Sequence, residues 1–293
     1  MSERLGISRG TTIRVLNEAR ERGEIQIWIA EDEAAAIALG AQLEKTLGID
    51  EAIVVPAAAS SPDFAKAVGM ALGKFLSEAL TDNMTVGIGW GRTLMASLAS
   101  LRPARHTGMK IVSLLGGIVE TRGSNPLEVS WRMANQFGAD CYLFVAPAFV
   151  DSVETKERLI DKCGLDRVFH LARALDVVVL SAGDISANAT SLSAKIITPR
   201  ELSELLELGC VCDVLCNFLD ADGQSIDHEV NRRVMSVDLD GLRSTGHIVI
   251  ATGGAHRAQA IRSAIRRIGC NTLVTDEPAA RALLELVARD TSS

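Results

Sequence analysis

The sequence predicts an α/β protein whose core is a mostly parallel, doubly wound sheet. Continuous apolar segments, such as 110–115 and 177–181, are typical of strands buried on both faces of a sheet. Amphipathic helical segments separate these strands along the chain. Glycine-rich turns follow several strands, and parallel sheets bind ligands at the carboxyl ends of their strands. With 293 residues, 47% of them hydrophobic, the chain can bury a sizeable core.

Apolar periodicity predicts the elements in chain order. A short strand-like segment at 25–29 precedes an acidic helix at 31–47. The expected strands of the sheet are 52–56, 85–89, 110–115, 140–145, 177–181, 248–251 and 272–275. The expected helices are 62–80, one from about 93, 126–137, 152–161, 166–174, 201–208, 257–267 and 278–287. Residues 211–219 fit no single element, although a strand is one interpretation.

Residues 4–23 have the pattern of the second half of a helix-turn-helix, and the chain begins within this motif. Gly6 permits the left-handed backbone that ends a helix, and Ser8 is a suitable N-cap for the next one. The first turn of that helix would carry hydroxyl and guanidinium groups, which suit phosphates and base edges in a major groove. The predicted DNA-binding residues are Ser8, Arg9, Thr11, Thr12 and Arg14. An ordinary amphipathic surface helix is the alternative.

Charge is distributed unevenly between this segment and the rest of the chain. Residues 1–29 contain five Arg and four acidic residues, a net charge of +1. The whole chain carries −7, so the remaining residues carry −8. A small neutral-to-basic segment on a larger acidic body suits a DNA-reading domain joined to a sensor. We therefore expect a partial winged helix-turn-helix at 1–29 and an effector-binding domain at 30–293.

The N-terminus is charged and lacks the apolar region of a signal peptide, and no apolar run is long enough to span a membrane. A cytoplasmic protein is therefore expected. Six cysteines in a chain of this size do not form a disulfide framework. The cluster Cys210, Cys212 and Cys216 lacks a fourth ligand at zinc spacing, so buried structural thiols are favoured over a metal site. No cofactor is expected.

The turn at 87–94 is the first candidate ligand site, because it lies between a strand and a helix. Gly89 and Gly91 would let the backbone approach an anion closely, and the amides at the start of the helix would donate to it. Arg92 and Thr93 add a charge and a hydroxyl. The turn lacks the Gly-Lys-Ser/Thr ending of a P-loop. A tight turn with glycines for packing is the alternative.

Four further turns follow predicted strands. They contain Gly116 and Gly117, residues 145–148, Asp184 within 181–184, and Gly254 with Arg257 within 252–257. His256, in the last of them, is interpreted as a solvent-exposed or capping residue rather than a base. Asp213 lies in an apolar, cysteine-rich run, where a carboxylate needs a partner. It could bind sugar hydroxyls or cap backbone amides.

These motifs together resemble the SorC family of bacterial sugar-responsive transcriptional regulators, over nearly the whole chain. The matching segments are the turn and helix at 5–23, Gly89–Leu94, 137–139, 146–151, 209–223 with Asp213 inside, 252–261 and Thr275-Asp276-Glu277. The resemblance implies an effector domain with the fold of sugar-phosphate isomerases and deaminases, a cytoplasmic location, and a homo-tetramer or dimer. It also implies that a sugar phosphate alters affinity for operator DNA.

Carried onto this sequence, the resemblance places a phosphate on Gly89, Gly91, Arg92 and Thr93. Asp213 and the Gly116 turn would face the sugar. The other predicted effector-binding residues are Gly117, Asp184, Gly254 and Arg257. Arg257 stands where the family usually has Lys, which retains a cationic contact of different shape.

The sequence also departs from the family. Leu115 replaces a usually polar residue, and Cys212 and Cys216 replace glycines. The pocket is therefore expected to be less polar, and a polyol or an unphosphorylated sugar is an alternative ligand. The family's helices before the turn have no counterpart before Leu5, which implies a shortened or impaired reader.

An enzyme on the same sheet, such as a sugar-phosphate isomerase or deaminase, is the alternative function. That chemistry needs a general base and acid near the same sugar carbons. The stretch that corresponds to the deaminases' His-containing loop is Gly183-Asp184-Ile185-Ser186, which has no His. We therefore predict a regulator without catalytic residues.

Overall fold

The computed structural model describes residues 33–56, 63–119, 125–186, 189, 191 and 196–290. The predicted DNA-contacting residues (Ser8, Arg9, Thr11, Thr12 and Arg14) lie outside this part of the chain. The predicted boundary between residues 29 and 30 also lies outside it. Residues 35–293 form a compact unit, which contains the candidate ligand-binding turns.

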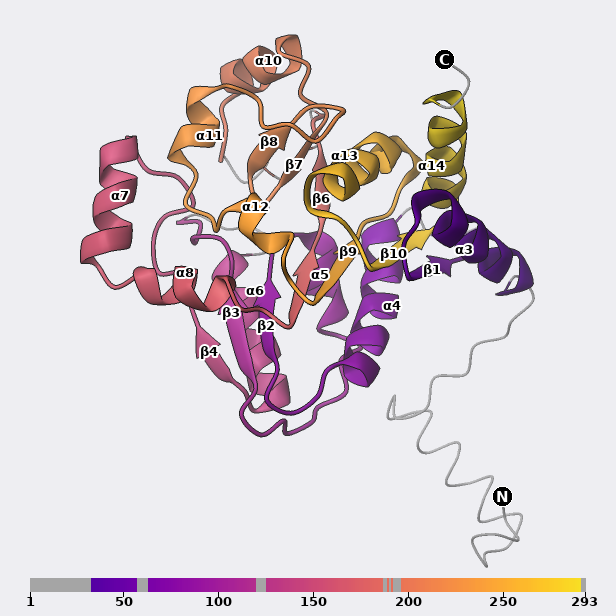
Figure 1. Cartoon of the computed structure of the whole chain (residues 1–293), viewed down its shortest axis with the longest axis horizontal. Coiled ribbons are helices and arrows are strands. Elements are labelled where there is room, and N and C mark those ends of the chain that lie inside the picture. The colour runs from indigo at the N-terminus through magenta and orange to yellow at the C-terminus, as the bar shows by residue number, and fades with distance from the viewer. Residues whose placement is uncertain are drawn as a thin grey trace, which may run out of the picture. The chain divides into compact units, whose positions relative to one another are not determined.

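The core of this unit is a seven-stranded, all-parallel sheet in the order β1-β10-β9-β5-β2-β3-β4 (Figure 1). The strands are β1 (Glu51–Val55), β2 (Thr85–Ile88), β3 (Lys110–Ser113), β4 (Asp140–Tyr142), β5 (Val177–Leu180), β9 (His247–Ala251) and β10 (Thr272–Asp276). All six pairings are parallel. The predicted fold class is therefore confirmed.

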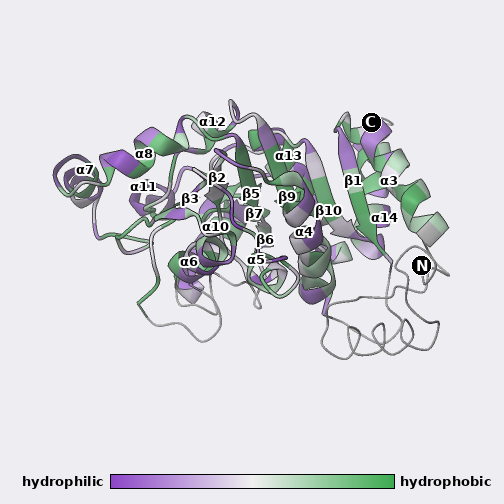
Figure 2. Cartoon of the chain, turned by 90° about the horizontal axis from the view of Figure 1, so that it is seen from below, coloured by the Kyte–Doolittle hydropathy of each residue, from purple (hydrophilic) through white to green (hydrophobic). Residues whose placement is uncertain are grey.

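Helices cover both faces of the sheet (Figure 2). One face is covered by α4 (Phe64–Ala79), α5 (Arg92–Ser97) and α6 (Pro126–Phe137). Against the other face lie α3 (Glu33–Leu47), α8 (Asp166–Ala172), α12 (Leu239–Leu242), α13 (Ala258–Ile268) and α14 (Glu277–Asp290). Two layers of helices explain why the strands are continuously apolar. Along β5, Val177 and Val179 pack toward the first layer, and Val178 and Leu180 toward the second.

A second, three-stranded antiparallel sheet follows β5, and the sequence did not predict it. It consists of β6 (Ala182–Asp184), β7 (Cys212–Val214) and β8 (Asn217–Leu219). The unassigned segment 211–219 is thus a β7–β8 hairpin. A small core under α10 (Pro199–Glu207) contains Leu205 and Phe218.

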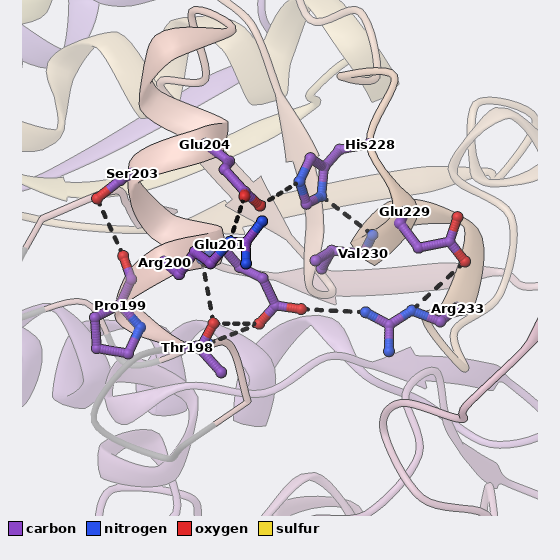
Figure 3. A network of polar contacts seen from close by, with 10 residues as sticks. All are labelled: Thr198, Pro199, Arg200, Glu201, Ser203, Glu204, His228, Glu229, Val230 and Arg233. Carbon is purple, nitrogen blue, oxygen red and sulfur yellow. Dashed lines mark hydrogen bonds and ion pairs between the residues drawn. The ribbon is translucent and has the colours of Figure 1, made fainter.

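A polar network joins α10 to α11 (Glu229–Arg233) beside this sheet (Figure 3). Thr198 and Glu201 form a capping box at the start of α10, and Glu201 also pairs with Arg233 at 3.1 Å. His228 caps α11 through Nδ1, which accepts from the Val230 amide, so its Nε2 carries the proton toward Glu204. These contacts hold α10 and α11 together beside the β6–β8 sheet.

The remaining elements are α7 (Val153–Lys162) and the 3-10 turn η1 (Ala255–Arg257), which starts the predicted helix at 257–267. Four strands, β2, β3, β4 and β5, are shorter than predicted. β3 ends at Ser113 because the chain turns away, and Leu115 instead bridges to Ser236. No helix in the described part of the chain is long and apolar enough to cross a membrane.

Candidate functional site

A cleft opens at the point where the strand order of the large sheet reverses. β2 and β5 are neighbours, but the chain leaves β2 toward β3 on one side and returns through β5 on the other. Loops diverge at such a point, which makes it the usual ligand site of open α/β sheets. The cleft walls are residues 90–93 after β2, residues 181–183 after β5, Ser191, Asp213, Leu215 and Arg257.

The glycine loop after β2 forms the first wall. Gly91 has φ 134°, a backbone conformation that favours glycine, and it caps α5 without a side chain. The amides that open a helix lack intrahelical acceptors, so those of Arg92 and Thr93 are free to donate. Thr93 is buried, whereas Arg92 is exposed and forms no ion pair with any residue that the structure describes.

Hydroxyl groups fix the second wall, at the end of β5. The Thr252 hydroxyl, which follows β9, accepts from the Ala182 amide at 2.8 Å and lies 3.2 Å from the Ser181 hydroxyl. Thr252 is fully buried. This contact ties the carboxyl ends of β5 and β9 together and fixes the position of residues 181–183.

A buried ion pair lies behind the cleft. The Arg257 Nε donates to Asp184 Oδ1 at 2.7 Å, and the Arg257 guanidinium carbon lies 4.8 Å from the centre of the Phe64 ring. Burial opposes ionisation of Asp184, but hydrogen bonds from Ser186 and Arg257 outweigh it and lower the pKa of Asp184. His256 Nε2 lies 3.9 Å from the same carboxylate, so Asp184 is its acidic neighbour.

Asp213 is the second carboxyl of the site and forms no ion pair with any residue in the described part of the chain. It is 9% exposed and accepts a hydrogen bond from the Cys216 amide. Burial, with a smaller contribution from the charge of Asp184, raises its pKa to about 6. Gly183 lies opposite Asp213 in the β6–β7 pair, and a Cβ there would meet Asp213 Oδ1 at 2.3 Å. The absence of a side chain at Gly183 thus leaves the space that the Asp213 carboxyl group occupies.

The hairpin turn beside Asp213 has an unusual composition. Leu215 and Cys216 both have positive φ, at 51° and 59°, where two-residue turns normally have Asn or Gly. Trp90 makes a side-chain hydrogen bond to the Cys216 thiol. Cys216 therefore has a backbone conformation that favours glycine and contacts the glycine loop through Trp90.

The structure brings together Gly91, Arg92, Thr93, Asp213 and Arg257 at the cleft, with Asp184 directly behind Arg257. The other predicted glycines do not line it, and their amides have protein acceptors. The amide of Gly89 donates to Val179, Gly116 to Met235, Gly117 to Ala146 and Gly254 to the Asp276 carboxylate. A Cβ on Gly116 would lie 2.6 Å from the Pro147 carbonyl oxygen, so close packing explains that turn.

Sequence reasoning missed Ser191 and Leu215. No pattern in the sequence marks Ser191, and Leu215 lies in the segment left unassigned. Asp276, from the closing Thr-Asp-Glu motif, has a structural role. Its carboxylate accepts from the amides of Gly254 and Ala279, and so joins the turn after β9 to the start of α14.

The clustered cysteines are buried. The Cys212 thiol contacts the Ser263 hydroxyl at 3.2 Å, and burial raises the pKa of the Cys210 thiol to about 12. Thiols with raised pKa values are poor nucleophiles and poor metal ligands. Within the described residues, no group of three or more His, Cys, Asp or Glu side chains could hold a metal ion.

A parallel α/β sheet with a polar cleft at its switch point defines a domain that binds a small polar molecule. Residues 32–285 match the family model described as "Putative sugar-binding domain" (Sugar-bind), and the chain belongs to this family.

Two curated relatives are transcriptional regulators. The erythritol catabolism regulatory protein EryD of Brucella abortus (strain 2308) is 27% identical over 286 residues, which cover 97% of this chain and 90% of EryD. The transcriptional regulator LsrR of Klebsiella pneumoniae subsp. pneumoniae is 30% identical over 294 residues, 98% of this chain and 88% of LsrR.

The full-length sorbitol operon regulator SorC from Klebsiella pneumoniae has the same fold. It superposes with a TM-score of 0.82 at 23% identity, over 97% of this chain and 92% of that one. Together these matches confirm the predicted SorC-type family and the predicted class of function, a transcriptional regulator with a sugar-binding domain.

Proposed function

We propose that a sugar, sugar phosphate or polyol binds in the cleft and controls binding of operator DNA by residues 1–29. The observation that carries this proposal is the composition of the cleft. Arg92, whose guanidinium forms no ion pair with a described residue, stands at the glycine loop, and Asp213, a buried carboxyl that also forms none with a described residue, lies in the same cleft. The erythritol catabolism regulatory protein EryD and the sorbitol operon regulator SorC, both similar to this chain, support a polyol or a related ligand.

Within the cleft, an anionic group would lie against Gly91, Arg92 and Thr93, and hydroxyl groups would meet Asp213. Arg257 acts as a positioning residue, because its Nε is held by Asp184. The amides of Gly89, Gly116, Gly117 and Gly254 support the fold and are not proposed as ligand contacts.

We further propose a homo-oligomer, a dimer or a tetramer, that acts in the cytoplasm. A regulator must reach chromosomal DNA, and two-fold assemblies suit paired half-sites. The division into a reader at 1–29 and an effector domain at 30–293 belongs to this proposal.

A thermal-shift screen tests the proposal, because a ligand that binds only the native state raises the melting temperature. The panel contains erythritol, sorbitol, ribose and 2-deoxyribose, each with its phosphate. Arg92→Ala should weaken binding of a phosphorylated compound much more than binding of its neutral counterpart. Arg173→Ala is the control, because Arg173 is also exposed but lies outside the cleft. Equal reductions for both ligand forms would contradict the anion site.

One observation favours an enzyme as the second candidate. A carboxyl with a pKa of about 6 is suited to general acid or base catalysis near neutral pH. Asp184 is less suited, since its ion pair with Arg257 lowers its pKa. Incubation of each sugar phosphate with the protein, followed by chromatography of the products, decides between the two. Turnover that Asp213→Asn abolishes would establish the enzyme.

A further inference from the structure

The hydroxyl of Ser191 has no hydrogen-bond partner among the residues that the structure describes. The residue is 1% exposed and lines the cleft together with Gly183 and Asp213. Its carbonyl oxygen accepts from the amides of Ile196 and Ile197, which fixes the backbone at this point. Its hydroxyl therefore has a donor and acceptors that no described residue uses.

The other buried serines in the described part of the chain all have partners. Ser97, Ser113, Ser130 and Ser263 donate to backbone carbonyls, and Ser236 accepts from the Asn217 amide group. A buried hydroxyl without a partner is costly, because it loses its hydrogen bonds to water and gains none. In a ligand cleft, such a hydroxyl is available to a hydrogen-bonding group of the ligand.

The presence of Asp213 in the same cleft limits which chemical groups of a ligand can bind there. Its carboxylate accepts one backbone amide, and the nearby cation, Arg257, is held by Asp184. The cleft therefore offers an acceptor at Asp213 and both a donor and an acceptor at Ser191. A phosphate oxygen could accept from Ser191 but could not donate to a carboxylate. A hydroxyl group can do both.

We propose that Ser191 and Asp213 bind the hydroxyl-bearing end of the ligand, where a hydroxyl group can accept from Ser191 and donate to Asp213. This inference rests on the proposed function and adds a specificity-determining residue to it. It also orients the ligand, with hydroxyl groups at Ser191 and Asp213 and any anionic group at Arg92.

The experiment uses the full chain and the tightest binder from the thermal-shift panel, titrated by calorimetry against wild type, Ser191→Ala and Ser130→Ala. Ser130 is a buried, hydrogen-bonded serine of α6 outside the cleft, so it is the matched control. We expect Ser191→Ala to weaken binding about tenfold, as the removal of one buried hydrogen bond predicts. Without ligand, its melting temperature should stay equal or rise, because an unpaired buried hydroxyl has been removed.

The control should show the opposite split, with unchanged affinity and a lower melting temperature. Ribose 5-phosphate and 2-deoxyribose 5-phosphate give a second measurement, in which wild type should prefer the compound with the additional hydroxyl more than Ser191→Ala does. Equal affinity of wild type and Ser191→Ala overturns the inference alone. A wild-type protein that binds no compound of the panel overturns the proposed function as well.

Discussion

Asp213 makes the stability of the fold depend on pH in a defined window. Burial raises its pKa to about 6, whereas an unfolded Asp has a pKa of about 4. Between these values the folded chain holds a proton that the unfolded chain has released. Stability therefore falls as the pH rises from about 4 to about 6, by up to about 3 kcal/mol.

Asp213→Asn should remove this slope, because an amide stays neutral at every pH. The measurement is the free energy of unfolding in urea, at several pH values between 4.5 and 7, for both proteins. The contribution of the histidines to the pH dependence is the same in both proteins, so it cancels in the difference between the two curves. It also avoids Asp184, whose lowered pKa affects stability only at lower pH. Parallel curves would show that Asp213 ionises normally in the fold.

Gly183 provides a second test at the residue scale. Gly183→Ala places a Cβ at 2.3 Å from Asp213 Oδ1, so we expect the carboxylate to move and ligand binding to be abolished. In an Asp213→Gly background the same substitution meets no carboxylate, so it should reduce the free energy of unfolding by less than it does in the wild type. The coupling free energy from a double-mutant cycle measures this difference. Additive costs would mean that the two positions do not interact.

At the scale of elements, the packing of α4 on α5 positions the glycine loop. A Cβ at Gly69 would lie 2.6 Å from both the Thr93 carbonyl oxygen and the Ala96 Cβ. Gly69→Ala should therefore destabilise the protein by about 1–3 kcal/mol through overpacking. That cost exceeds the gain in helix propensity, which is about 1 kcal/mol. Since Thr93 belongs to the cleft, affinity for a phosphorylated ligand should fall as well.

Gly241→Ala, in α12, is the control for this prediction. A Cβ there meets no atom within 4 Å, so only the propensity gain applies and the protein should become slightly more stable. Denaturant titration of both variants gives the comparison. If Gly69→Ala is as stable as Gly241→Ala, then close helix packing does not constrain the loop.

The large elements follow from sequence because their signals are local. The run of four apolar residues in β5 and the amphipathic pattern of α6 each indicate an element directly. The β6–β8 sheet escaped prediction because its strands have only three residues each, too few to show a period of two. Its turn also has Leu215 and Cys216 in place of the usual Asn or Gly.

The site was predictable only in part, because it depends on tertiary contacts between residues far apart in the sequence. Strand order places the turns after β2 and β5 side by side, and the sequence identified both turns. A glycine amide can bind a ligand only if no other residue accepts its hydrogen bond, and that residue can be far away in the sequence. Gly116 donates to Met235, which is 119 residues away along the chain. Ser191 is defined by the absence of a partner among the described residues, which no sequence pattern encodes.

For the whole molecule, the division of charge predicts how DNA binding responds to salt. The body is acidic and residues 1–29 carry +1, so phosphate contacts should come from the arginines of that segment. Removing one phosphate contact reduces the slope of log K against log salt by about 0.9. Arg9→Ala and Arg14→Ala should each lower the slope by that amount in a fluorescence anisotropy titration with promoter DNA. Arg173→Ala should leave it unchanged.

The proposed regulation requires that ligand binding in the cleft and operator binding be coupled. If a ligand changes the operator Kd by some factor, the operator must change the ligand Kd by the same factor, because the two sites share one free energy cycle. Calorimetric titration of the ligand, with and without operator DNA, should reproduce the factor found by anisotropy. Asp213→Asn should weaken ligand binding yet leave the operator Kd of the ligand-free protein unchanged, since residue 213 lies in the effector unit. Unequal factors would show that a third equilibrium, such as assembly of subunits, is also coupled to binding.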